Sequence, residues 1–351
     1  MKKALSFLLI ITLVITSSLV GCTNKDKPSY NIQTKEISYI YFNTVSIMSS
    51  YADISEDEFR TYVDEADRLL GKYHKLFDIY HEYSGINNLC TVNKNAGVAP
   101  VAVDDDLIIF LEYCKKLYTI TQEKTNIMLG SVLKIWHDHR SIASDDPTKA
   151  TVPSIESLTA ASAHAAIDSL VIDKTAKTVY ITDPEASIDV GAIGKGYATE
   201  KLYERLKSLG ADNVALNIGG NLRTIGLKPD KTVWITGITN PNRLSSESFI
   251  AKVKLGEASL VTSGDYERYY YVGETKYHHI IDPITLMPST YFSSVSIITP
   301  DSALADALST ALFCMSYEDG LELVESIGGV EVIWVDREYN VKHTDGIVFA
   351  K

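Results

Sequence analysis

Apolar residues recur every three or four positions in four parts of the chain, a spacing that predicts amphipathic helices. The first of these segments starts with Ser55 and Glu58, which are typical of an N-terminal capping box. The third follows a strand and a glycine-rich turn and ends at Gly210, a residue type that commonly terminates helices. The predicted helices lie within residues 55–80, 104–123, 187–212 and 301–328, the last segment being long enough for two.

Other segments have the apolar runs and alternation of β-strands. Residues 170–183 and 259–283 each contain two such runs about a turn, the pattern of a β-hairpin. Helices and strands are mixed without a regular βαβ repeat, so we expect an α+β fold with helices on one side of a largely antiparallel sheet. The polar residues 141–154 are predicted to form a surface loop. The remaining predicted strands lie within residues 37–52, 213–226, 232–239 and 330–347.

The first residues predict export and a lipid anchor. Lys2 and Lys3 precede an apolar run over residues 4–20, which ends in the sequence LVGC at Cys22. This order is typical of a bacterial lipoprotein signal that is cleaved before the cysteine, which is then acylated. A plain membrane helix is the alternative, but hydroxyl residues interrupt the run and it is short for a bilayer span. We therefore expect a protein anchored by lipid to the extracytoplasmic face of the cell membrane. The expected parts of the chain are a signal peptide (1–21), a flexible tether (22–36) and one domain (37–351).

Composition narrows the possible function. The 351-residue chain carries a net charge of −12, which argues against nucleic-acid binding and against electrostatic attraction to anionic lipids. Membrane attachment must then come from the acyl chains. The other cysteines are Cys90, Cys114 and Cys314. They are widely spaced without a CxxC motif, so we expect buried apolar residues and not a disulfide framework or a zinc site.

Two adjacent histidines stand near the end of a predicted strand, in the sequence KYHHIIDP of residues 276–283. Strand alternation places His279 and Ile281 on one face and His278 on the other, so one imidazole should face inward. An inward histidine near Asp282 is either a satisfied core residue or a proton-transfer group.

Two other segments could bind phosphate or a cation. The turn DVGAIGKG at residues 189–196 lacks the spacing of a P-loop or of GxGxxG, yet its backbone N–H groups and Lys195 could hold a phosphate. A tight structural turn is the alternative. Asp306 and Thr310 lie four residues apart on the polar face of a predicted helix and could share a cation such as Mg²⁺; an exposed acid and threonine without function are the alternative. The apolar residues of that helix form a stripe toward the core: Leu304, Ala307, Leu308, Ala311, Leu312 and Met315.

His137 and His139 are spaced as metal ligands on a strand would be. No third ligand is evident, so we interpret them as structural. The tyrosines of TSGDYERYYY are expected to be packing residues of a hairpin.

Together these motifs resemble the ApbE family, the FAD:protein FMN transferases. The resemblance covers essentially the whole chain after the signal, with the motifs in the same order. They are YFNTVSIM, INNLCTVN, TNIMLGSVLKIW, DVGAIGKGYA, NIGGNLRTIG, TSGDYERYY, HHIIDP and ADALSTALF.

The resemblance implies an ApbE-like (T-fold-like) α+β fold with FAD held between two halves of the molecule. It implies an enzyme that uses Mg²⁺ to split FAD, releases AMP, and attaches FMN through a phosphoester to a threonine of a partner protein. The implied partner is an exported or membrane redox protein with a motif of the Ser/Thr-Gly-Ala-Thr type, and no nucleic acid is involved.

The resemblance also assigns roles to residues by position. It makes His279 catalytic, with Asp282 orienting its ring. It assigns magnesium binding to the side chains of Asp306 and Thr310 and to the carbonyl of Ala192. The positions that resemble the family's FAD contacts are Phe42, Asn126, Ile127, Asp189, Lys195 and Ile281.

Two positions depart from the family pattern. Leu286 replaces the glycine of Asp-Pro-x-Thr-Gly-x-Pro, so we expect this turn to differ in shape. Ala303 stands where some relatives carry another acid near the metal helix.

Three other functions are considered. A Mg²⁺-dependent FAD pyrophosphatase, with water as acceptor, would give free FMN and AMP and use the same residues. A flavin-binding lipoprotein without catalysis is disfavoured because His279, Asp306 and Thr310 are all present. A solute-binding lipoprotein is disfavoured because no pair of repeated α/β lobes is evident.

Overall fold

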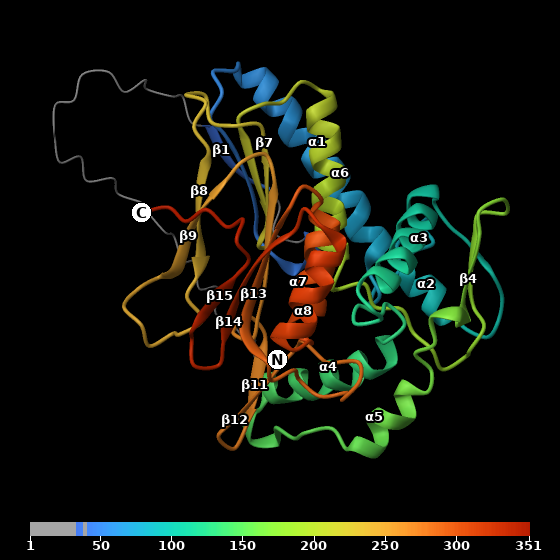
Figure 1. Ribbon diagram of the computed structural model, residues 1–351. Helices are drawn as coiled ribbons and strands as arrows, with labels where there is room; N and C mark the ends of the chain where they lie inside the picture. The colour runs from blue at the N-terminus through green and yellow to red at the C-terminus, as the bar shows by residue number, and fades with distance from the viewer. Residues whose placement is uncertain (1–32, 38–40) are drawn as a thin grey trace, which may run out of the picture.

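The computed structural model describes residues 33–37 and 41–351 (Figure 1). The predicted signal peptide and Cys22 lie outside these residues. Within the described chain, no helix is both long and apolar enough to cross a bilayer. The end of the expected tether forms strand β1 (Gln33–Ile37), which pairs with β2 (Ser46–Ser50).

The described chain is a mixed α+β structure, as the sequence predicted. The helices are α1 (Glu56–Phe77), α2 (Leu89–Lys94), α3 (Asp105–Ile120), α4 (Gly130–Asp145), α5 (Ile155–Ser162), α6 (Gly194–Ser208), α7 (Ser302–Phe313) and α8 (Tyr317–Ile327), with 3₁₀ turns at Tyr41–Asn43, Pro147–Lys149 and Ile167–Ser169. The strands after β2 are β3 (Val101–Ala102), β4 (Leu170–Asp173), β5 (Thr178–Ile181), β6 (Val214–Ile218), β7 (Asn221–Ile225), β8 (Trp234–Thr239), β9 (Phe249–Leu255), β10 (Ser259–Gly264), β11 (Tyr269–Val272), β12 (Thr275–His278), β13 (Phe292–Thr299), β14 (Glu331–Asp336) and β15 (Val341–His343).

An eight-stranded sheet forms the centre of the molecule, in the order β1-β2-β6-β7-β10-β13-β14-β15. Each neighbouring pair in this sheet is antiparallel. Three smaller antiparallel sheets surround it, formed by β3-β5-β4, β8-β9 and β11-β12. The pairing confirms the predicted sheet type.

Helices α1, α6 and α7 lie side by side along one face of the large sheet (Figure 1). Helix α7 packs on β7, β10 and β13, and α6 lies between α7 and α1. The predicted apolar stripe of α7 faces the core, since its residues from Ala307 to Met315 are buried and Leu304 packs against the core partly buried. Burial of this stripe is the main force that holds α7 on the sheet.

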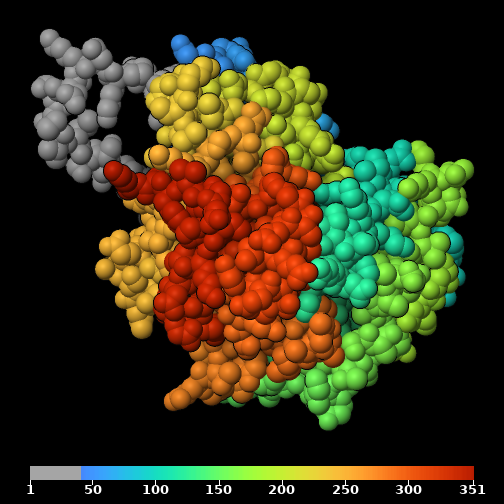
Figure 2. Space-filling model, in the orientation of Figure 1, coloured from blue at the N-terminus to red at the C-terminus, as the bar shows by residue number. Residues whose placement is uncertain are grey.

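The chain between β2 and β6 builds a second part of the molecule beside the C-terminal part. In Figure 2 the cyan and green surface of α3, α4 and α5 meets the orange and red surface of the later residues. Several long-range hydrogen bonds cross this boundary, which we call the seam. Tyr113 of α3 donates to Asp301 at 2.6 Å, and the indole of Trp136 in α4 donates to the carbonyl of Leu286 at 2.9 Å.

Local sequence signals account for several helix ends. The Ser55 hydroxyl accepts the N–H of Glu58 at 3.2 Å and caps α1, whereas the Glu58 carboxylate accepts from the Tyr62 hydroxyl, so only the serine half of the predicted capping box is present. Helix α6 ends at Ser208, two residues before Gly210, which has a φ of +87° that favours glycine. The N–H of Ala211 then returns to the carbonyl of Leu206 at 3.0 Å and closes the turn.

Two predictions of local structure were wrong. The predicted loop over residues 141–154 includes the end of helix α4, on which His137 and His139 also lie. The apolar side chains that α4 buries are few, so its periodicity is weak in the sequence. The predicted hairpin over residues 259–283 is in fact β10, which belongs to the large sheet, followed by the separate hairpin β11-β12.

Candidate active site

One short segment, Lys124–Leu129, connects the predicted site residues across the seam. The Thr125 hydroxyl donates to the carbonyl of Ala307 in α7 at 2.9 Å. The ammonium group of Lys124 lies 3.3 Å from the carboxylate of Asp282. The carbonyl of Ile127 accepts the N–H of Asp189 at 2.8 Å. This segment therefore fixes the positions of α7, the loop after β12 and the glycine-rich turn relative to one another.

Asp306 lies at the crossing of α6 and α7. Its carboxylate accepts the N–H of Gly196 at 2.8 Å, and the ammonium group of Lys195 is 3.6 Å away. Only 4% of Asp306 is exposed, so the expectation that it lies on a polar outer face was wrong. Burial raises the pKa of Asp306, and the charge of Lys195 acts in the opposite direction. A cation beside this buried carboxylate would stabilise its charged form.

The crossing also supplies two oxygens that have no hydrogen-bond partner. Because the N–H of Gly196 donates to Asp306, it does not donate to the carbonyl of Ala192, four residues earlier. Among the described residues, neither that carbonyl nor the Thr310 hydroxyl takes part in a hydrogen bond. A carboxylate, a hydroxyl and a carbonyl are the oxygen donors that Mg²⁺ prefers. The donor set therefore fits the predicted metal, although no cluster of three acidic, histidine or cysteine side chains occurs in the described chain.

His278 is the last residue of β12, and His279 follows it outside the strand. His278 is buried; its Nε2 lies 2.8 Å from the carbonyl of Ser289 and its ring packs edge-on against Phe313. His279 keeps accessible surface, and its Nδ1 lies 3.2 Å from the carbonyl of Arg268. As predicted, one imidazole of the pair, that of His278, faces inward, and the other, that of His279, is accessible.

The predicted role of Asp282 needs correction. Its carboxylate contacts Lys124 and accepts hydrogen bonds from the N–H of Ile284 and the hydroxyl of Thr285, and no hydrogen bond in the described chain joins it to His279. The carbonyl of Arg268 orients the His279 ring instead. Asp282 is buried and paired across the seam, so it acts on the position of the loop and not directly on the imidazole.

The turn after Asp282 keeps the backbone conformation of a glycine. Leu286 has a φ of +61°, in the left-handed region that glycine favours. Its side chain is buried in a cluster with Trp136 and Ile281, and its carbonyl accepts the Trp136 indole N–H. The backbone thus adopts an angle that glycine favours, and packing of the leucine side chain offsets its cost.

The predicted flavin contacts differ in accessibility. Phe42 is partly exposed, and its N–H donates to the imidazole of His74 at 3.2 Å. Asn126 is also partly exposed, but its amide donates to the carbonyl of Ala165 and its oxygen accepts the N–H of Met128. The side chains of Ile127 and Ile281 are buried in two different hydrophobic clusters. These two residues can support the wall of the site by packing, but they expose little surface to a ligand.

Asp189 adjoins a group of residues that the sequence did not identify. Its carboxylate accepts the N–H of Gly191 at 2.8 Å. Burial raises the pKa of Asp189, while the charges of Arg140 and Arg268 act in the opposite direction. Arg140 directly follows His139, and Arg268 stands in the sequence TSGDYERYYY, but neither local sequence shows which arginine lies near the glycine-rich turn.

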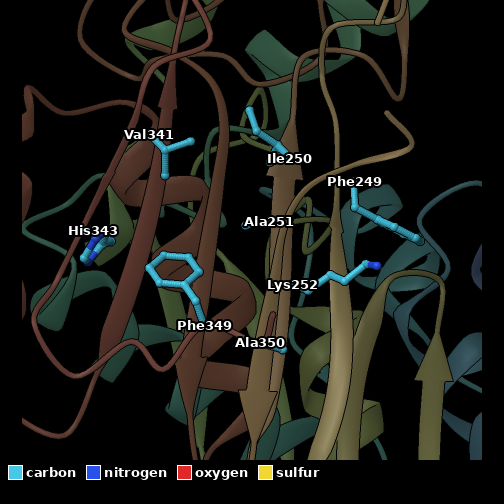
Figure 3. A pocket seen from close by; sticks show the side chains of 8 residues that line it. All are labelled: Phe249, Ile250, Ala251, Lys252, Val341, His343, Phe349 and Ala350. Atoms are coloured by element: carbon cyan, nitrogen blue, oxygen red, sulfur yellow. The ribbon is translucent and has the colours of Figure 1, made fainter. Parts of the chain in front are cut away.

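A separate groove lies between β9 and β15, the last strand of the large sheet (Figure 3). Its volume is about 510 Å³, and it contains none of the predicted site residues. The residues that line it belong to β9, β15 and the C-terminal segment: Phe249, Ile250, Ala251, Lys252, Val341, His343, Phe349 and Ala350.

An oxygen donor set, a lysine and an accessible neutral imidazole around a glycine-rich turn are typical of enzymes that act on phosphate anhydrides.

Comparison with known proteins agrees with this class. The ApbE family model matches residues 42–334. The FAD:protein FMN transferase of Treponema pallidum (strain Nichols) is 32% identical over 273 residues, which are 74% of this chain and 74% of that relative. The enzyme of the same description from Haemophilus influenzae is 26% identical over 331 residues, 93% of this chain and 91% of that relative.

Solved structures give the same result. The ApbE protein of Thermotoga maritima superposes with a TM-score of 0.77 at 25% identity, covering 89% of this chain and 97% of its own. The flavin transferase ApbE of Vibrio cholerae gives 0.72 at 25% identity with the same coverage. The chain therefore belongs to the ApbE family, and by homology it is an enzyme of the FAD:protein FMN transferase class.

Proposed function

We propose that this enzyme transfers FMN from FAD to a threonine hydroxyl of a partner protein in a magnesium-dependent reaction and releases AMP. The observation that carries the proposal is that residues 124–129 contact both the loop that follows His279, through Asp282, and helix α7, through Ala307, so that the imidazole and the oxygen donors belong to segments held together by the same residues. In the reaction, the threonine oxygen forms a bond to the phosphorus of FMN. The bond from that phosphorus to the bridging oxygen breaks, and the oxygen leaves with AMP.

The chain offers a defined site for the metal. Ala192, Asp306 and Thr310 would hold Mg²⁺, which when bound supplies positive charge to the phosphate oxygens. Lys195, 3.6 Å from the Asp306 carboxylate, adds a second positive charge at the same place. These charges offset the anionic character of a pyrophosphate in a protein whose net charge is −12.

The tautomer of His279 suits a general base. A carbonyl oxygen can only accept, so Nδ1 must carry the proton that it donates to the Arg268 carbonyl. Nε2 then has a free lone pair that can take the proton of the attacking threonine. The ring of His279 is only partly exposed; its loss of hydration, followed by the charge of Arg268, lowers its pKa to about 3, so the ring is neutral at physiological pH. Bound phosphates would oppose these cations and raise the basicity of the ring when substrate is present.

The experiment mixes residues 23–351 with FAD, Mg²⁺ and a candidate acceptor fragment that carries a Ser/Thr-Gly-Ala-Thr-type motif. Mass spectrometry then shows whether FMN is on the protein or free. We expect His279→Ala to bind FAD but to lose transfer by about 10²–10⁴-fold. His343→Ala, at an exposed histidine of β15, is the matched control and should keep full activity. Transfer by the His279 variant near the wild-type rate would remove the imidazole from the mechanism. Free FMN without labelled acceptor would identify the pyrophosphatase alternative.

We also propose that the mature protein is anchored at the extracytoplasmic face of the membrane through acylated Cys22. The signal-like residues 1–21 support this proposal. Its partner would then be an exported or membrane redox protein. Cys22→Ser should move the protein from the membrane fraction to the soluble fraction. Retention of that variant in membranes would contradict a lipid anchor at this residue.

A further inference from the structure

Two arginines near His279 have no carboxylate partner. Arg140 lies on α4 and Arg268 immediately precedes β11, and these two elements pack together. Among the described residues, no carboxylate lies within ion-pair distance of either guanidinium group. The side-chain hydrogen bond of Arg140 goes to Nδ1 of His137 at 2.9 Å.

The partner of Arg140 is neutral. Burial and the charge of Arg140 lower the pKa of His137, and its Nδ1 accepts from the guanidinium group. Tyr80 packs on the other side of this imidazole, with ring centroids 5.3 Å apart. The arrangement fixes the direction of Arg140 without neutralising its charge.

The two arginines are close enough to act on the same neighbours. The backbone carbonyl of Arg268 accepts from both the N–H and the Nδ1 of His279, at 3.0 and 3.2 Å. The charges of Arg140 and Arg268 both act on His279, on Asp189 and on Tyr80. They also act on each other: burial and then the charge of Arg268 lower the pKa of Arg140.

Asp189 does not serve as their counter-ion. Its carboxylate lies beyond ion-pair distance from both guanidinium groups and is used by the N–H of Gly191. Two like charges held near one another without an anion are unfavourable, and a bound anion would relieve their repulsion. Guanidinium groups suit phosphate in particular, because their planar N–H groups can bind two of its oxygens at once.

We propose that Arg140 and Arg268 together form a binding site for a phosphate group of the dinucleotide substrate, next to His279. The identity of this ligand, a phosphate group of FAD, rests on the proposed function. It is distinct from the oxygen donors of α6 and α7, which would hold the cation. The substrate phosphates would then lie between positive charge from two sources, with the base beside the guanidinium pair.

The experiment compares three probes on the full-length chain in detergent: FAD, riboflavin and inorganic pyrophosphate. Flavin fluorescence measures the first two, and calorimetry measures pyrophosphate. Arg140→Gln and Arg268→Gln should each weaken FAD and pyrophosphate by roughly 10- to 100-fold, the size of a lost hydrogen bond to a charged group, and leave riboflavin unchanged. Arg60→Gln, at an exposed arginine of α1, is the matched control and should change none of the three.

Each outcome has a definite meaning. Equal losses for riboflavin and FAD would show that the arginines only support the fold, and unchanged affinity for pyrophosphate would show that they bind no phosphate; either result overturns the proposal. If a glutamine variant fails to fold, Arg140→Lys or Arg268→Lys replaces it: the lysine keeps the charge but loses the planar pair of N–H groups, so it should still weaken pyrophosphate and leave riboflavin unchanged, and unchanged affinity for pyrophosphate again overturns the proposal. Pyrophosphate binding is measured without transfer, so loss of the guanidinium site and absence of flavin transfer can be told apart.

Discussion

At the scale of single residues, His278 and His279 are neighbours in sequence but differ in surroundings. Both ring nitrogens of His278 are used, because Nε2–H donates to the carbonyl of Ser289 and Nδ1 accepts the N–H of Ile280 at 3.2 Å. A second proton on the ring, at Nδ1, would point at the N–H of Ile280, which donates to that nitrogen. Burial lowers the pKa of His278 to about 4. His278 is therefore a structural residue held in its neutral form.

This neutral state predicts acid sensitivity. Between about pH 6.5 and 4 the unfolded chain protonates His278 while the native protein does not, so the free energy of unfolding should fall as the pH falls. The slope from this group is at most roughly 1.4 kcal/mol per pH unit. Urea unfolding at pH 7, 6 and 5 measures it. His278→Phe, which keeps an aromatic contact with Phe313, should be less stable at pH 7 and show a shallower pH dependence. An unchanged slope would mean that other groups cause the acid sensitivity.

Leu286 combines backbone strain with side-chain packing. Its φ of +61° costs about 1 kcal/mol for a residue with a Cβ, whereas its buried side chain stabilises the fold. Leu286→Ala keeps the strain and loses the packing, and should destabilise the protein by about 2–5 kcal/mol. Leu286→Gly loses the same packing but relieves the strain. We therefore expect the glycine variant to be more stable than the alanine variant by about 1 kcal/mol in denaturant unfolding, the reverse of the order in an ordinary helix. Equal stabilities would show that the turn carries no strain.

The sequence proposes candidate site residues, but it does not show their partners. The helical spacing of Asp306 and Thr310 only allows them to share a cation, and the resemblance to the ApbE family selects them as metal ligands. The burial of Asp306 depends on the N–H of Gly196, which is 110 residues away, and no local pattern reports it. The same holds for Asp282, whose ion pair with Lys124 spans 158 residues.

At the scale of elements, the close crossing of α6 and α7 creates the proposed metal site. A Cβ at Gly196 would collide with the carbonyl of Ser302 and lie 2.5 Å from Cβ of Asp306. Only a glycine allows the two helices to approach so that its N–H reaches the Asp306 carboxylate. The glycine-rich turn is thus explained by helix packing as well as by any phosphate that it binds.

Gly196→Ala should separate these helices. We expect a loss of about 1–3 kcal/mol in the free energy of unfolding from overpacking, together with weaker binding of Mg²⁺ measured by calorimetry. Gly256→Ala is the matched control, since no atom lies within 4 Å of its added Cβ. If the Gly196 variant binds Mg²⁺ as tightly as wild type, the helix crossing does not set the geometry of the metal ligands.

The elements that could be predicted are those with a continuous apolar stripe, such as α1 and α7. Helix α4 could not be predicted, because it buries few apolar side chains and its contacts come from distant residues: Trp136 packs with Leu286, 150 positions later. Strand β10 was misassigned for a related reason. Its alternation is correct for a strand, but only its pairing with β7 and β13 shows that it belongs to the large sheet.

At the scale of the whole molecule, the site is divided between the two sides of the seam. Asn126 and Asp189 belong to the part built before β6, whereas His279 and Asp306 belong to the C-terminal part. The two parts share one hydrophobic core and are also joined by specific hydrogen bonds, among them those of Tyr113, Thr125 and Trp136. A ligand that contacts both sides should therefore stabilise the whole fold and not one part alone.

This arrangement predicts how substrate and metal change thermal stability. A ligand that binds only the folded protein stabilises it by about 2.7 kcal/mol at a concentration of 100 times its dissociation constant. We expect FAD with Mg²⁺ to raise the unfolding temperature more than either alone. The variant His279→Ala should show the same rise in unfolding temperature, because it stops turnover without removing a group that binds the metal. Asp306→Asn in the His279→Ala background should lose the part that depends on Mg²⁺, whereas Glu325→Gln, an exposed acid on α8, should not. Since binding is measured without catalysis, an undiminished effect of Mg²⁺ in the Asp306 variant would show directly that the ion is held elsewhere, and the helix crossing would then be a packing feature without a metal.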